Sequence, residues 1–354
     1  MGAISSVGHD VVTACAAIRA GLASPSPLTH FPVLEEESQQ SVPLMGHAVA
    51  GMTDGFSSVG RWLQMAPRAF DDLVRSGALP DRENTAFWQR TGVVFATPVL
   101  DDERFEHAVQ CHPERIGHTF VEPMLLATHR PPAAANHWLV SEGHRGALCA
   151  IADAAARIHH TLERVVVIAV DSWLDAFSLS WLAERHRLKT DENPVGMMPG
   201  EAAVALLIEA RGAAERRHAK VLASIVGLSL EQEEMDSGKA GPGDGAAQGR
   251  ALAAAMESAK IQAPFEGDLV VDHNGESWRG HELAMLRTRG PRRLLGNCRV
   301  VAPALSTGDT GAASAALGIA CGVRSLQRGY SAAEKVVVQS RSDWGGVGIL
   351  ILSS

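Results

Sequence analysis

The sequence is poor in aromatic residues and has no excess of basic ones. Phenylalanine, tryptophan and tyrosine make up 5% of the 354 residues, and the formal net charge is −8. Nucleic-acid binding relies on a basic surface and often on aromatic rings that stack on bases, so this composition argues against a nucleic-acid partner. The same negative charge argues against attraction to an anionic membrane surface.

The sequence also lacks the cysteine and histidine spacings of a disulfide framework or a metal site. No C-x-x-C pair connects the five cysteines, which are Cys15, Cys111, Cys149, Cys298 and Cys321. This scatter is typical of reduced thiols in a cytoplasmic protein. Fifteen histidines are present, but none forms an H-x-x-x-H or H-E-x-x-H pattern. We therefore predict neither a metal nor another cofactor.

Long hydrophobic runs are missing as well. The longest stretch of small and apolar residues, 311–323, is shorter than the roughly 20 residues that a helix needs to cross a bilayer. The first residues lack the basic start and apolar core of a secretion signal. We expect a cytoplasmic protein that does not enter a membrane.

What the sequence does contain is a regular alternation of apolar runs and alanine-rich helical patterns. The strand-like runs are 93–97, 165–170, 203–209, 221–230, 268–273, 336–340 and 347–352. The helical patterns are 61–77, 150–163, 249–260, 280–289 and 312–329. Continuous apolar strands separated by helices are typical of a largely parallel sheet that is covered on both faces. The fold class predicted is α/β.

The order of these elements is repeated within the chain. GHRGA (143–147) begins a helix that leads to VVVIAVDSW (165–173) and AVALLIEA (203–210). GDTGA (308–312) begins a second helix that leads to VVVQSRSDW (336–344) and VGILILSS (347–354). Two similar halves would let their small-residue helices pack closely against each other. We place the boundary between the halves after residue 213.

Further motifs suggest a family. They include the opening segment 1–25, NPVGMMPGEAAVALLIEA (193–210), DHNGESWRG (272–280) and WGGVGILIL (344–352). In this order, they make the chain similar to the thiolase-like superfamily, and within it to the β-ketoacyl synthases, also called 3-oxoacyl-[acyl-carrier-protein] synthases. The resemblance implies a thiolase fold: two duplicated βαβαβαββ halves, 1–213 and 214–354, in an αβαβα layered arrangement. It also implies a homodimer formed by joining edge strands.

The resemblance also assigns the remnants of a site. VSEGHRGA (140–147) falls on the corner where these synthases carry their cysteine nucleophile, so His144 takes the nucleophile position. His273 matches a family histidine, and Asp309 stands where the family has a second histidine or an asparagine. The glycines expected to border the substrate are Gly308, Gly345 and Gly346.

These substitutions make condensation unfavourable. A helix N-terminus disfavours imidazolium, so we expect a neutral His144, and an acyl-imidazole would hydrolyse quickly. An ionised Asp309 would repel the enolate that an asparagine would stabilise. Cys149 lies more than a helical turn beyond the corner, and we expect its thiol in core packing.

Three readings stay open at this point. The first is a thiolase-like protein that has lost the catalytic cysteine and serves in binding or assembly, and it resembles those encoded beside type VI secretion effectors, which implies a role in effector loading. The second is an acyltransferase, decarboxylase or hydrolase that uses His144, His273 and Asp309 on an acyl-carrier protein or acyl-coenzyme A. The third is an unrelated α/β enzyme. The first two readings differ in whether the protein still catalyses a reaction on acyl thioesters.

Overall fold

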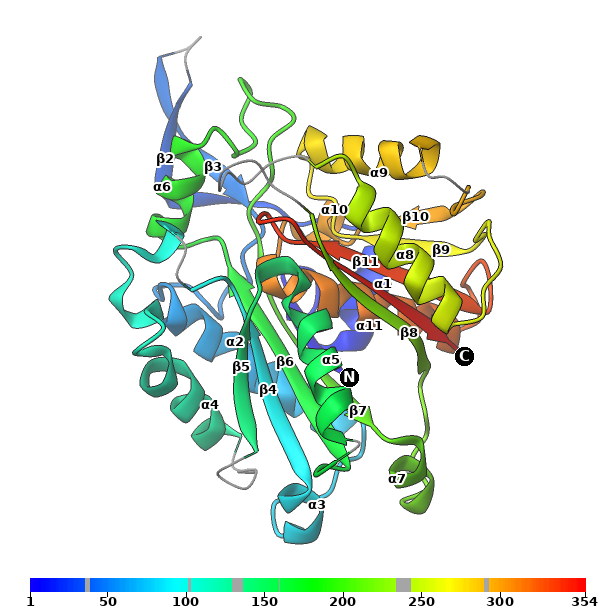
Figure 1. The fold of residues 1–354 in the computed structure, drawn as a ribbon. Coiled ribbons are helices and arrows are strands. Elements are labelled where there is room, and N and C mark those ends of the chain that lie inside the picture. Colours follow the sequence, from blue (N-terminus) through cyan, green and yellow to red (C-terminus); the bar gives the residue numbers. More distant parts are fainter. Residues whose placement is uncertain (36–38, 101–102, 129–135, 159, 234–242, 290–292) are drawn as a thin grey trace.

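Two five-stranded sheets form the framework of the molecule (Figure 1). The computed structural model describes residues 1–35, 39–100, 103–128, 136–158, 160–233, 243–289 and 293–354. All statements about structure concern these residues.

The first sheet has the order β1-β7-β6-β4-β5. Its strands are β1 (Gly2–Ser5), β4 (Thr91–Thr97), β5 (His137–Ser141), β6 (Arg164–Ser172) and β7 (Glu201–Glu209). Strand β4 pairs in parallel with β5 and β6, whereas β7 pairs antiparallel with β6 and β1. The sheet is therefore mixed, and its three parallel strands end at the same edge.

The second sheet repeats this pattern in the order β10-β9-β11-β12-β8. Its strands are β8 (Ser224–Gln232), β9 (Asp268–Val271), β10 (Arg299–Val301), β11 (Lys335–Arg341) and β12 (Gly346–Ser353). Strand β9 pairs in parallel with β10 and β11, and β12 pairs antiparallel with β11 and β8. The two sheets thus have equivalent strands in equivalent places, which confirms the predicted α/β thiolase fold of two similar halves.

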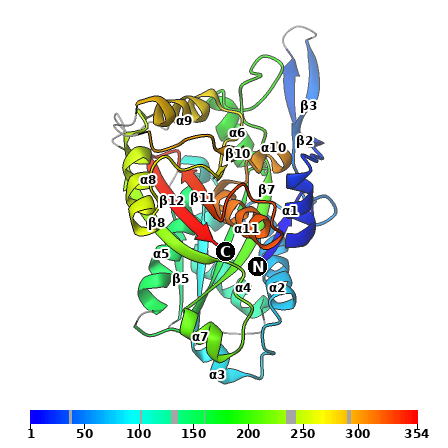
Figure 2. The same cartoon turned by 90° about the vertical axis from the view of Figure 1, so that its right-hand side faces the viewer.

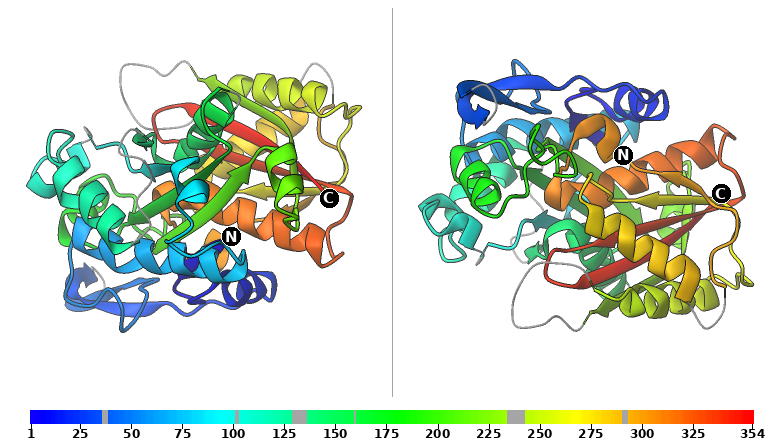
Figure 3. Two further views of the ribbon diagram at one scale, coloured as in Figure 1. Left: turned by 90° about the horizontal axis from the view of Figure 1, so that it is seen from below. Right: turned by 90° about the horizontal axis from the view of Figure 1, so that it is seen from above.

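Helices fill three layers around the sheets. The middle layer holds α5 (Gly146–Ile158) and α11 (Ser314–Gln327), with α1 (Val11–Arg19) beside them. The outer face of the first sheet carries α2 (Val59–Ser76) and α4 (Glu122–Ala127), and that of the second carries α8 (Ala246–Ser258) and α9 (Ser277–Arg289). The views from below and above show α11 between the sheets (Figure 3).

This layered arrangement explains why the strand sequences are apolar along their whole length. In β6, Val165 and Val167 face the central core, while Val166 and Ile168 face the outer one. A strand that is buried on both faces needs apolar residues at every position, which explains the lack of alternation. In α11, Gly318 packs directly on β9 and β11, where an added Cβ would lie 3.2 Å from a Val270 methyl carbon.

A β-hairpin and several short helices complete the structure. Strands β2 (Ser26–Glu35) and β3 (Gln40–Gly46) form the hairpin, which projects from one end of the molecule (Figure 2). The remaining helices are α3 (Thr85–Gln89), α6 (Ala176–Glu184), α7 (Arg211–Arg216) and α10 (Ala304–Thr307). Single helical turns, Gly143–Arg145 and Gly311–Ala313, precede α5 and α11.

The predicted boundary near residue 213 falls between the two sheets. The first sheet ends with Glu209 and the second begins with Ser224, and α7 lies between them. The division into 1–213 and 214–354 stays a prediction. Among the helices that the structure describes, none is both long and apolar enough to cross a membrane.

Candidate functional site

Two corners, one from each half, meet between the sheets. The first leads from β5 through Gly143, at φ +58°, into the turn that holds His144 and then into α5. The second leads from α10 through Gly308 and Asp309 to Gly311, at φ +52°, and then into α11. Both turns need the left-handed backbone conformation that glycine adopts without a steric penalty.

His144 and Asp309 form a direct contact across the two corners. The Nε2 atom of His144 lies 2.9 Å from Oδ1 and 3.0 Å from Oδ2 of Asp309. Both side chains are almost completely buried, with residue exposures of 3% and 1%. Two of the residues that the resemblance assigns to the site are thus in direct contact.

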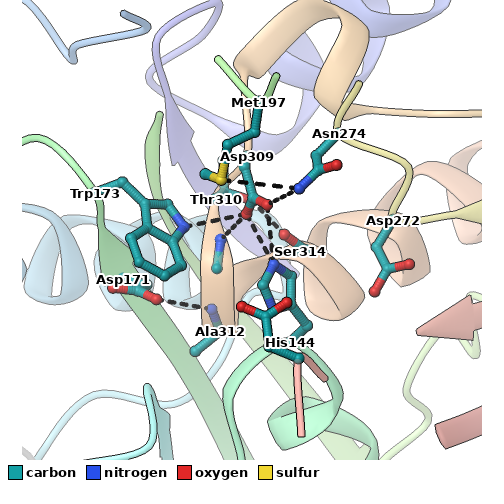
Figure 4. Close-up of polar contacts among 12 residues, drawn as sticks. His144, Asp171, Trp173, Met197, Asp272, Asn274, Asp309, Thr310, Ala312 and Ser314 are labelled. Atoms are coloured by element: carbon teal, nitrogen blue, oxygen red, sulfur yellow. Dashed lines mark hydrogen bonds and ion pairs between the residues drawn. The ribbon is translucent and has the colours of Figure 1, made fainter. Parts of the chain in front are cut away.

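Three further donors fill the Asp309 carboxylate. The indole Nε1 of Trp173 donates to Oδ1 at 3.2 Å, and the backbone N–H of Gly311 donates to the same oxygen at 2.7 Å. The amide Nδ2 of Asn274 donates to Oδ2 at 2.6 Å. Figure 4 shows these side chains converging on Asp309 from different elements. A carboxylate with both oxygens occupied in this way has little capacity left to accept a substrate proton.

The contact between the two residues also sets their charge. Burial alone would lower the pKa of His144, but the nearby Asp309 carboxylate raises it above its usual value. Burial alone would raise the pKa of Asp309, but His144, then Arg279 and the hydrogen bond from Asn274, hold it well below its usual range. Both shifts favour the charged form of the pair, imidazolium and carboxylate.

This charge state corrects the sequence-based expectation of a neutral His144. The positive end of a helix dipole carries about half an elementary charge. A full carboxylate charge at hydrogen-bond distance in a buried site outweighs it. An imidazolium has no lone pair on nitrogen, so His144 in this state is neither a nucleophile nor a base.

The loop after β9 reaches the pair through Asn274, one residue beyond His273. His273 is half-buried, and burial, opposed by Asp272 and aided by Arg279, lowers its pKa. Within the described part of the chain, the contact from this loop to Asp309 is made by the Asn274 amide, which also donates to Glu276 at 3.0 Å. A role for His273 as a third member of the site stays a prediction.

A second buried ion pair lies beside the first. Arg104 donates to Asp171 at 2.8 Å and to the backbone carbonyl of Ser172 at 2.6 Å. Its guanidinium also lies 3.6 Å from the centre of the Trp173 ring. Asp171 in turn accepts the backbone N–H of Ala312 at 3.1 Å, just before α11. This pair binds the first half to the second-half corner.

Beyond Asn274, ion pairs connect the second half to Arg187 of the first half. Glu276 forms a bidentate pair with Arg187 at 2.7 and 2.8 Å. Arg187 also donates to Asp343 at 2.7 Å, and Asp343 accepts from Arg279 at 3.0 Å. The site is therefore part of an extended buried network of charged groups in which each named group has a partner.

Little space remains at the corner of His144. The cavity there has a volume of about 30 Å³, and its lining includes His144, Arg104, Asp171, Trp173 and Asp343. This is about the volume that one water molecule occupies in the liquid. The indole of Trp173 fills the adjoining space, stacked on Trp181 at 6.0 Å between ring centres.

The three predicted substrate-border glycines have structural neighbours. An added Cβ at Gly346 would lie 2.3 Å from the Arg145 guanidinium carbon, and one at Gly308 would lie 2.8 Å from the Met198 carbonyl oxygen. Gly345, at φ +81°, accepts the backbone N–H of Glu233. Their contacts with the protein give each glycine a packing or turn role, and substrate binding by them stays a prediction.

The thiol nearest the corner in sequence is not activated. Cys149 lies on α5 and packs against the central core. Burial raises the pKa of its thiol to about 11. Among the described residues, no group of three or more histidine, cysteine, aspartate and glutamate side chains could hold a metal ion.

Sequence reasoning missed several members of the site. The missed residues are Arg104, Asp171, Trp173, Asn274, Arg279 and Asp343. A usable signal existed for some of them, because the repeated DSW and SDW segments contain Asp171, Trp173 and Asp343. Arg104 lies in a polar stretch without a motif, and only the three-dimensional structure places it here.

Comparison with solved structures identifies the fold. The chain superposes on the ishigamide ketosynthase/chain length factor with a TM-score of 0.74 at 17% identity, covering 100% of this chain and 97% of that one. A second match is a chain from the complex of a type II polyketide synthase acyl-carrier protein and its ketosynthase. The TM-score is 0.79 at 13% identity, and the match covers 100% of this chain and 97% of that one. A β-ketoacyl synthase from Burkholderia phymatum matches with a TM-score of 0.73 at 15% identity, covering 99% and 97%.

These likenesses extend over the whole chain, so the protein has the thiolase-like fold of the ketosynthases. No protein-family model matches the sequence, and no curated protein matches it either. At these sequence identities the comparisons define the fold alone, and the role of the site has to be argued from its residues and their contacts.

Proposed function

We propose that this protein uses a ketosynthase-like fold for binding or assembly, and that it does not condense acyl thioesters. The observation that carries the proposal is the buried ion pair of His144 and Asp309. In this pair the imidazolium cannot attack a carbonyl carbon, and both carboxylate oxygens already accept hydrogen bonds. His144 and Asp309 therefore bind each other and not a substrate.

The small volume of the cavity at His144 supports the same proposal. An acyl chain at the corner would have to displace Trp173, which donates to Asp309, stacks on Trp181 and lies under the Arg104 guanidinium. Losing these contacts would leave the Asp309 carboxylate and the Asp171 ion pair partly unsatisfied inside the protein. Burying polar groups without partners costs about 1–3 kcal/mol each.

The alternative is an acyltransferase, decarboxylase or hydrolase that uses His144, His273 and Asp309. Such an enzyme needs a neutral imidazole or a free carboxylate facing a substrate. The site residues favour the non-enzymatic reading because neither requirement is met in the contacts of His144 and Asp309.

Intact-protein mass spectrometry with acetyl-coenzyme A and longer acyl donors separates the two functions. We expect no covalent adduct on the wild-type protein, because no activated thiol stands at the corner. Stable acylation at any wild-type residue, or donor hydrolysis that a His144→Ala variant abolishes, would contradict the proposal.

A matched pair of variants shows whether the pocket or only the nucleophile has been lost. His144→Cys places a thiol at the corner but leaves Asp309 without its partner ion. The double variant His144→Cys/Asp309→Asn removes that unpaired charge as well. Because Trp173 occupies the space beside the small cavity, we expect neither variant to be acylated. Acylation of the double variant would mean that a chain can enter.

The ketosynthase fold suggests that the protein associates with a second copy of itself. The resemblance to loading proteins of type VI secretion suggests that its other partner is a secretion effector. Strand β5 is the outer strand of the first sheet, and a second copy could continue the sheet there. We propose a homodimer that binds a secretion effector. Light scattering at micromolar concentration should give twice the mass of the chain, and a larger mass with the effector encoded beside its gene. A monomer would contradict the dimer, and no complex would contradict the effector.

A further inference from the structure

A second depression lies at the end of the first sheet opposite to the His144 corner. Strands β4 and β6 begin there, under α3 and beside α7, at the lower end of Figure 1. The depression is open and has a volume of about 450 Å³. Its lining residues are Ala86, Phe87, Gln89, Arg90, Glu163 and Arg164. This volume is in the range of pockets that hold small molecules.

The charges around this depression do not balance. Arg90, Arg164 and Arg216 all converge on the Glu163 carboxylate, at 2.8, 2.6 and 2.9 Å. Arg164 also pairs with Glu209 at 2.9 Å, and Arg217 pairs with the same glutamate at 2.6 Å. Four guanidiniums thus share two carboxylates, and the cluster carries excess positive charge on a protein whose net charge is −8.

The arrangement of the guanidiniums is suited to a ligand. The Arg164 side chain is 5% exposed, donates to the Phe87 carbonyl at 3.1 Å and lies 4.1 Å from the centre of the Phe87 ring. Arg90 and Arg216 have side chains that are 66% exposed, and each donates a hydrogen bond to Glu163. A guanidinium has more N–H donors than this, in a planar fork that matches carboxylate and phosphate oxygens.

We infer that the depression under α3 binds a small oxyanion, the carboxylate or phosphate group of a metabolite, through Arg90 and Arg216 over a floor of Arg164 and Phe87. The anion would be a third acidic partner for the four guanidiniums, beside Glu163 and Glu209. Such charge-assisted, partly desolvated contacts are stronger than those of a fully exposed ion pair. This site is independent of the His144 corner and of the proposed function.

Titration of the purified protein with inorganic phosphate and with succinate tests the inference, at ionic strength held constant with sodium chloride. The readouts are isothermal calorimetry and the melting temperature. We expect saturable binding of at least one anion. The double variant Arg90→Ala/Arg216→Ala should bind it at least about tenfold more weakly. Preference for phosphate or succinate distinguishes the two ligand groups.

Arg82→Ala is the control, because Arg82 is similarly exposed, at 64%, and pairs with its neighbour Glu83 outside the depression. It should bind like the wild type. Phosphate also stabilises proteins non-specifically by exclusion from their surface, so only the difference between variants supports a site. Glu163→Gln should tighten binding, because it removes a competing carboxylate. Equal binding by wild type and the double variant, or an effect that chloride alone reproduces, would overturn the inference.

Discussion

His144 is the residue whose replacement most changes the chemistry of the fold. A cysteine at this corner would have a helix N-terminus beside its thiolate, whereas the histidine has a carboxylate 2.9 Å away. The buried pair is held by contacts from both halves, since Trp173 and Asn274 reach the same carboxylate. In this structure the corner is a contact between the two halves.

We expect His144→Ala to destabilise the protein by about 3 kcal/mol, because removing one partner of a buried pair leaves the other charge uncompensated. Urea denaturation at pH 5.5 measures the free energy of unfolding. The remaining donors to Asp309, from Trp173, Asn274 and Gly311, limit the loss. Unchanged stability would mean that the pair contributes nothing to folding.

The pair also predicts how stability depends on pH. The pKa of His144 is raised on folding, so its contribution is complete below pH 6.5 and is lost as pH rises through the folded pKa. The pKa of Asp309 is depressed, so its contribution is present above pH 3.8 and is lost as pH falls through the folded pKa. Between these values the pair contributes fully.

A His144→Gln variant checks this sign. Glutamine keeps a donor for Asp309 but does not titrate. The wild type should therefore lose stability relative to the variant as the pH rises above 6.5 and through the folded pKa of His144. Parallel pH profiles for the two proteins would contradict an ionised His144.

At the scale of elements, the turn before α11 depends on a glycine. Gly311 has φ +52°, and an added Cβ would lie 1.9 Å from the Asp171 carboxylate, which pairs with Arg104. Gly311→Ala should cost about 3 kcal/mol through backbone strain and displacement of this ion pair. Thermal unfolding followed by circular dichroism measures the effect.

Gly280 on α9 is the matched control. Nothing lies within 4 Å of the position where its Cβ would be, and it is exposed. Gly280→Ala should stabilise the helix by about 0.5–1 kcal/mol. A Gly311→Ala protein as stable as the wild type would show that the turn can move away from Asp171.

The elements also show what sequence reasoning can reach. The apolar runs 165–170 and 336–340 predict β6 and β11, since strands buried on both faces need apolar residues throughout. The hairpin of β2 and β3 carries no such signal, because its residues include prolines and exposed side chains. Its place follows from packing of Leu28 and Leu44 against α6.

The site was predictable to a similar degree. The resemblance to the β-ketoacyl synthases assigned His144 and Asp309 to one site, and the structure has them in contact. The charge of His144 was predicted wrongly, since a local helix-dipole argument omits a carboxylate that is 165 residues away in sequence. Arg187 approaches the network from a loop and Arg279 from α9, and neither position belongs to a recognisable sequence pattern.

For the whole molecule, the central core predicts how the protein unfolds. This core contains Ala147 and Ile151 from α5, Ala316 and Leu317 from α11, and residues of both sheets. Neither half can separate without exposing it. Although the sequence repeats its elements, we expect the two halves to unfold in one cooperative transition.

Leu350→Ala tests this cooperativity. Leu350 lies in β12, is fully buried in the central core, and belongs to the second half. Its truncation should cost about 3 kcal/mol. Tryptophan fluorescence mainly reports the first half, because five of the seven tryptophans precede residue 213: Trp62, Trp88, Trp138, Trp173 and Trp181. Far-ultraviolet circular dichroism reports both halves.

In one cooperative unit, Leu350→Ala shifts the fluorescence and dichroism midpoints by the same amount in urea. With independent halves, the fluorescence midpoint would stay near that of the wild type while the dichroism curve acquired two steps. Leu305→Ala, at a leucine that is 76% exposed on α10, should leave both midpoints unchanged. A common shift would mean that the His144 corner, which lies between the halves, persists only while both are folded.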